Sequence, residues 1–72
     1  MTDKQIDLSK KLELLGFTKG NQVTLYGEVF ELVGRPLVIS DDVVLIDAIE
    51  TESGLSRRVR IPLAIVSMAK AA

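Results

Sequence analysis

From residue 20 onward, short runs rich in Val, Ile and Leu are separated by Gly, Pro, Asp and Ser. Apolar, β-branched runs bounded by turn residues are typical of β-strands, so this pattern constrains the fold more than any other feature of the chain. It predicts five strands: residues 23–26, residues 29–39 with an interruption, residues 43–50, residues 57–61 and a short fifth strand over residues 64–68. We therefore expect a mostly β fold.

Gly34 and Pro36 cause the interruption in the second strand. A glycine within a strand marks a sharp bend or a bulge, and a proline cannot donate to a ladder of hydrogen bonds. The second strand should therefore bend sharply at this point.

A helix is predicted ahead of the strands, over residues 3–15. Leu8, Leu12 and Leu15 follow one another at spacings of four and three, which is the period of a helix, and Gly16 can end it. Because the apolar stripe is narrow, we expect this helix to lie on a surface of the domain and not within its interior.

The segment between the third and fourth strands contains Ser53 and Gly54, a pair that favours a two-residue hairpin turn. A turn there predicts these opposite pairs: Glu50 with Arg57, Asp47 with Arg60, Ala48 with Val59, and Ile46 with Ile61. Opposite charges then face each other, and so do apolar side chains. The acidic residues and the arginines can therefore be cross-strand partners, although a binding role for the arginines stays open.

The 72 residues suffice for one domain, residues 1–72, and include neither Cys nor His. Disulfide scaffolds, Cys/His metal sites and the common nucleophile–base pairs need these residues. We expect no enzymatic activity, catalytic residue, metal site or cofactor. The net charge of −1 also argues against a general binder of polyanions.

Apolar residues make up 47% of the chain, and so short a chain buries only about 60% of the surface that its unfolded form exposes. Self-association is the usual remedy for small domains of this kind.

The longest uncharged stretch, residues 61–69, is too short to span a bilayer, and the charged N-terminal residues do not suit a signal peptide. The sequence therefore predicts a cytoplasmic homo-oligomer with no membrane partner.

Several segments resemble the Sm-like family of small β-barrels, to which Hfq belongs. The resemblance rests on residues 20–26 for the first strand, on Gly34, Leu37, residues 41–45 and residues 47–48 for one signature motif, and on residues 59–65 for the other. It implies a five-stranded SH3-like barrel over residues 20–69 behind the N-terminal helix.

In that family, the fourth strand of one subunit pairs with the fifth strand of the next, which closes rings of about five to seven subunits. The resemblance places this interface at Val59, Ile61, Ile65, Val66 and Met68. An exposed, apolar strand edge also favours the addition of another strand.

The family's activity implies a ring that binds single-stranded RNA or scaffolds an RNA–protein assembly. The corresponding RNA site would comprise Asp41, Asp42, Val43, Arg58 and Arg60. The aromatic and Asn positions of the family's pocket hold Asp, Val and Val here, and Pro62-Leu63 stands where Hfq has a Lys-His pair.

Residues 8–23 and 34–39 are similar to FeoA-type accessory domains of ferrous-iron transport. That family is also SH3-like and acts through protein contacts. Its members have a strand before the helix, which this sequence lacks. The alternative function is therefore a protein-interaction module that binds a protein partner and no nucleic acid.

Overall fold

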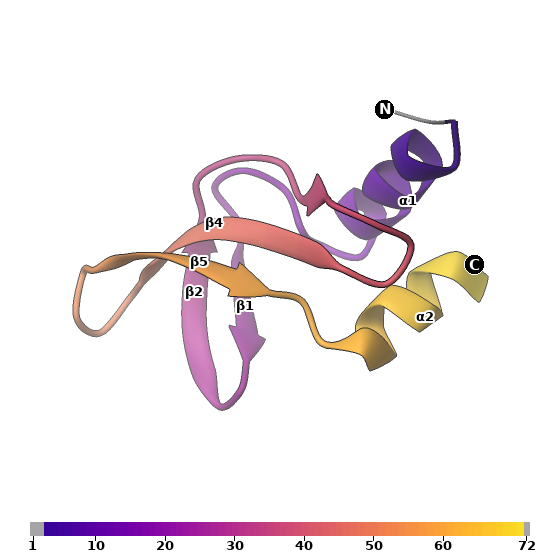
Figure 1. Ribbon diagram of the computed structural model, residues 1–72. Helices are drawn as coiled ribbons and strands as arrows, with labels where there is room; N and C mark the ends of the chain where they lie inside the picture. The colour runs from indigo at the N-terminus through magenta and orange to yellow at the C-terminus, as the bar shows by residue number, and fades with distance from the viewer. Residues whose placement is uncertain (1–2, 72) are drawn as a thin grey trace.

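The computed structural model describes residues 3–71, which form two helices and one five-stranded antiparallel sheet (Figure 1). In chain order the elements are α1 (Asp3–Leu14), β1 (Gln22–Leu25), β2 (Glu28–Leu32), β3 (Leu37–Val38), β4 (Val44–Glu50), β5 (Ser56–Arg60) and α2 (Leu63–Ala71). The predicted N-terminal helix and the mostly β character of the chain are confirmed.

Strand β4 is the centre of the sheet. One of its edges pairs first with β2, where Leu32 faces Ala48, and then with β3, where Leu37 faces Leu45; β5 occupies the other edge. Strands β2 and β3 therefore lie along the same edge and are interrupted between Leu32 and Leu37. This confirms the predicted bend at Gly34 and Pro36.

A tight turn joins β1 to β2. Leu25 pairs with Glu28, so the loop consists of Tyr26 and Gly27, whose φ angles are 54° and 75°. Positive φ at both central residues is typical of a type I′ turn, which matches the twist of the strands that it joins. The side-chain hydroxyl of Tyr26, at the end of this hairpin, donates a hydrogen bond to the carbonyl of Arg60 on β5.

The β4–β5 hairpin differs from its predicted register by two residues. Ile46 faces Val59 and Asp47 faces Arg58, whereas the sequence predicted partners two residues further along. A shift of two residues keeps every side chain on its predicted face of the sheet. The apolar and polar faces are therefore as expected, while the individual pairs are not.

The reason for the shift is a longer turn. The Glu50 amide donates to the Leu55 carbonyl at 2.9 Å, and the Gly54 amide donates to the Glu50 carbonyl at 2.8 Å. The loop therefore spans residues 51–54 rather than two residues. Gly54 takes a φ of 74°, which glycine adopts at no steric cost.

The predicted fifth strand, residues 64–68, is wrong, because these residues belong to helix α2. Proline suits the start of a helix, and the Pro62 carbonyl accepts hydrogen bonds from the amides of Ile65 and Val66 at 3.0 and 3.2 Å. Leu, Ala, Met and Lys, which make up six of the nine residues of α2, are good helix formers. Five strands are nevertheless present because the interrupted second strand counts as two.

Helix α1 packs against α2 and against β3, and the two helices lie together at one end of the sheet (Figure 1). A single core joins helices and strands. It consists of Leu8, Leu12, Phe17, Leu25, Phe30, Leu32, Val38, Val44, Ile46, Ala48, Val59, Ile61, Val66 and Ala69. Helix α1 buries Leu8 and Leu12 of the predicted stripe, whereas Leu15, its third leucine, lies beyond the end of the helix and is 45% exposed.

Candidate functional site

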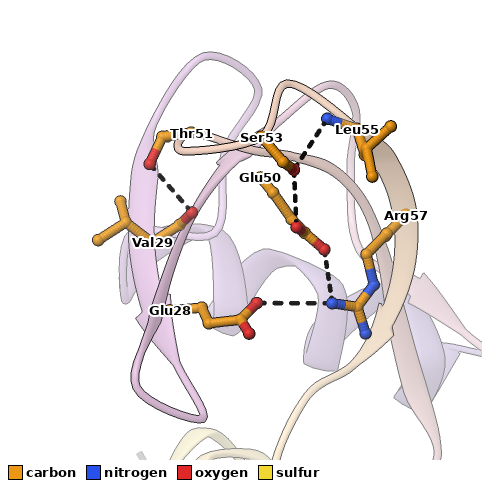
Figure 2. Close-up of polar contacts among 7 residues, drawn as sticks. All are labelled: Glu28, Val29, Glu50, Thr51, Ser53, Leu55 and Arg57. Atoms are coloured by element: carbon orange, nitrogen blue, oxygen red, sulfur yellow. Dashed lines mark hydrogen bonds and ion pairs between the residues drawn. The ribbon is translucent and has the colours of Figure 1, made fainter.

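Arg57 lies at the centre of a cluster of charged side chains at the end of the β4–β5 hairpin. Its Nη1 is 2.6 Å from a carboxylate oxygen of Glu50 and 3.5 Å from one of Glu28 (Figure 2). Its guanidinium also lies 5.9 Å from the centre of the Phe30 ring. The predicted Glu50–Arg57 partnership is confirmed as an ion pair, although the two residues are not directly opposite in the ladder.

The hydrogen bonds of this cluster shift the pKa values of Glu50 and Arg57. Hydrogen bonds from Arg57 and Ser53 hold the pKa of the Glu50 carboxyl below its ordinary value, and the bond to Glu50 raises the pKa of Arg57. A carboxyl with a lowered pKa stabilises the folded state above its unfolded pKa of about 4.3. That contribution disappears as the pH falls through the lowered, folded-state pKa.

We therefore expect Glu50→Gln to flatten the acid side of the stability profile. The parent chain should lose stability below about pH 4.3 more steeply than the variant, because only the parent has this carboxylate to protonate. Urea unfolding midpoints measured from pH 7 to pH 2 would check this. Glu52→Gln is the matched control, since Glu52 is exposed in the same loop. Equal acid slopes for the parent and Glu50→Gln would contradict the expectation.

Of the two arginines predicted to bind RNA, Arg58 is already paired. Its Nε lies 2.9 Å from the Asp47 carboxylate on β4, and this contact also raises the pKa of Arg58. The predicted partner of Asp47 was Arg60. Among residues 3–71, the side chain of Arg60 has no ion pair, so Arg60 alone of the two offers an uncompensated charge.

The loop between β3 and β4 holds the other predicted RNA-binding residues. Asp42 is 3.0 Å from Lys70 on α2, and the Val43 carbonyl accepts hydrogen bonds from two amides of the same loop. Within the described residues, no hydrogen bond or ion pair joins Asp41 or Asp42 to Arg58 or Arg60. The structure therefore ties this loop to α2 and not to the arginines.

Asp41 lines a cleft of about 280 Å³ between α1, the loop and α2. Its other lining residues are Lys4, Gln5, Asp7, Leu8, Lys11 and Lys70. Three lysines and two aspartates line this space. An anion placed in it would approach carboxylates as well as ammonium groups, so the cleft has no strong preference for a charged ligand.

The five residues predicted at a subunit interface differ in their exposure. Val59, Ile61 and Val66 are buried in the core of the single chain, so their side chains form no exposed surface there. Ile65 is half-buried against that core, and Met68 is 60% exposed. A helix also leaves no strand at residues 64–68 to pair with a neighbour.

The outward face of α2 is a surface that the sequence prediction missed. We define it as Leu63, Ala64, Ser67, Met68 and Ala71, all of which are exposed and uncharged. Exposed helix faces normally carry charged or polar residues, and a helix that is apolar all round is normally buried. The signal was present in the sequence, because Ala64, Ser67, Met68 and Ala71 recur at helical spacing.

Neither protein-family models nor curated proteins nor solved structures give a match to this chain. Within residues 3–71, neither helix has the length and apolar character needed to cross a membrane. The functional argument therefore rests on the surfaces of the described residues.

Proposed function

We propose that the chain is a small assembly module that acts by binding protein surfaces, in the first place a second copy of itself. The observation that carries this proposal is the outward face of α2, which is exposed and contains no charged side chain. Contiguous apolar surface of this kind on a small domain marks an interaction site. It also gives the high apolar content of the chain a place to be buried.

The surface charges favour protein over RNA as the partner. Arg57 and Arg58 are compensated by carboxylates within the chain, and the net charge is −1. Single-stranded RNA is usually bound by a positive groove with aromatic side chains on which bases stack. Phe17 and Phe30 are buried, which leaves Tyr26 as the only exposed aromatic ring of this chain.

A small SH3-like barrel remains our proposal for the fold family. Strands β1 and β5 each have one neighbour in the described sheet, so no backbone ladder joins them. Two side-chain contacts instead join β5 to the β1–β2 hairpin: Tyr26 in its turn donates to the Arg60 carbonyl, and Arg57 pairs with Glu28 on β2. These contacts and the bend between β2 and β3 support the proposal of an SH3-like barrel.

A ring built by strand addition is less well supported than a contact through α2. The edge strand that the predicted ring would use is β5, which carries three arginines. Charged residues on an edge strand discourage pairing with another strand, and two copies of β5 would place like charges close together. The contact that the surface favours therefore uses the helix.

Light scattering and sedimentation over a range from micromolar to near-millimolar concentration test the proposal. We expect the average mass to rise above the 7.9 kDa of a single chain as the concentration increases. A mass that stays at one chain over the whole range would overturn it.

Titration with oligo-U and oligo-A at low and high salt tests the RNA alternative. We expect no binding whose strength falls with salt, because few phosphates can be neutralised by this surface. Salt-dependent binding that Arg60→Ala weakens would overturn the proposal in favour of RNA, since Arg60 is the arginine on β5 without an ion pair among residues 3–71. The matched control is Arg35→Ala, at an exposed arginine outside the sheet.

A further inference from the structure

We infer that two copies of the chain associate through the outward face of α2, around a two-fold axis that passes near Ser67. This inference rests on the proposed function and gives it a surface, a partner and a symmetry. It predicts a dimer, whereas the strand addition expected from the sequence would give a ring of several subunits.

The exposure of α2 is divided sharply between its two sides. Val66 and Ala69 are completely buried against the core, while Leu63 and Met68, at the two edges of the outward face, are 53% and 60% exposed. The helix is thus apolar on both sides, although the core covers only one of them. A second apolar surface is needed to cover the other.

The charged residues around α2 leave its outward face free to contact the same face of a second copy. Lys70 is the only charged residue of the helix, and its ammonium group is held 3.0 Å from Asp42 at the side next to the β3–β4 loop. Two such faces can therefore meet without bringing like charges together. The arginine-bearing edge of β5 lacks this property.

The sequence of the face suits a two-fold contact. In an isologous contact the same patch serves both partners, so residues at equal distances from the centre face each other. With Ser67 at the centre, the large Leu63 of one copy meets the small Ala71 of the other. Small side chains at the centre and at one end let the two helices approach closely.

The size of the face sets the strength of the contact. A helix of nine residues is about 13.5 Å long. A standard interface buries about 800 Å² on each partner, which is roughly one-sixth of the 4615 Å² surface of this chain. One short helix supplies less than that, so we expect a concentration-dependent dimer with a dissociation constant in the micromolar range or weaker.

Single cysteines can report the contact, because the chain has no natural cysteine. Packed helices have axes about 8–10 Å apart, and their Cα atoms lie about 2.3 Å from the axis, so facing Cα atoms come within disulfide reach. We expect Ser67→Cys to form disulfide-linked dimers under mild oxidation at least about tenfold faster than Ser56→Cys. Ser56 is the matched control, since it is an exposed serine at the start of β5.

The outcomes separate the inference from the proposed function. If the mass rises with concentration but Ser67→Cys links no faster than Ser56→Cys, assembly stands and the α2 contact is wrong. Faster linking by Ser56→Cys would instead assign the contact to the β5 edge. A mass that stays at one chain overturns both.

A second pair of variants tests the same surface without oxidation. Met68→Lys and Leu55→Lys each place a charge at a side chain of nearly equal exposure, 60% and 62%, but only Met68 lies on the outward face of α2. We expect Met68→Lys to weaken dimerisation at least about tenfold, because the two-fold axis brings two new ammonium groups close together. Leu55→Lys should leave it unchanged. Equal dissociation constants for both variants would overturn the inference.

Discussion

Replacing Phe30 with alanine is expected to lower the free energy of unfolding by about 3–5 kcal/mol. Phe30 is 1% exposed on β2 and is the largest fully buried side chain of the core. Phe→Ala substitutions in cores cost about 3–5 kcal/mol. Domains of 72 residues have a total stability of only about 4–11 kcal/mol, so this loss is a large share of the total.

Urea denaturation followed by far-UV circular dichroism measures this loss. The conservative control is Phe30→Leu, which keeps an apolar side chain in the site and should cost clearly less than the alanine variant. Phe30 also lies beneath the guanidinium of Arg57, so Arg57→Met separates the cation–π contact from the packing. An unfolding midpoint of Phe30→Ala close to that of the parent would contradict the assignment of Phe30 to the core.

The hairpin shows which part of a sheet can be derived from sequence. Alternation of apolar and polar residues along β4 and β5 correctly predicts which side chains face the core, because a strand has a side-chain period of two. The turn cannot be derived as well, since Ser53 and Gly54 are compatible with loops of different lengths. Gly54 takes the positive φ of a four-residue loop, and this moves the register by two residues.

The C-terminal segment shows a different difficulty. A short apolar run such as residues 64–68 is compatible with either a buried strand or a helix, and its periodicity alone does not decide between them. Two signals in the sequence favour the helix, namely Pro62 shortly before the run, and Ala64 and Met68 within it.

The candidate site could be predicted only in part for the same reason. The pairing of acidic residues with the β5 arginines follows from the strand pattern and is confirmed for Glu50 and Arg57. The outward face of α2 depends on first recognising the helix, so a strand prediction hides it. Side-chain contacts between distant segments, such as Tyr26 with Arg60, have no local signal at all.

The helical state of residues 63–71 predicts a large effect of Ser67→Pro. A proline inside a helix removes a backbone hydrogen bond and clashes with the carbonyl four residues earlier, here that of Leu63, at a cost of about 3 kcal/mol or more. Breaking α2 there would also disturb the packing of Val66 and Ala69, which are both fully buried. We therefore expect Ser67→Pro to lose most of the stability of the chain.

The control variant is Ser67→Ala, which should leave the urea midpoint unchanged or raise it slightly, because alanine is the better helix former. The comparison also tests the two alternatives for this segment. On an exposed edge strand, a proline whose missing amide faces solvent is tolerated. A midpoint for Ser67→Pro equal to that of Ser67→Ala would therefore contradict the helix and restore the fifth strand, together with the ring that pairs through it.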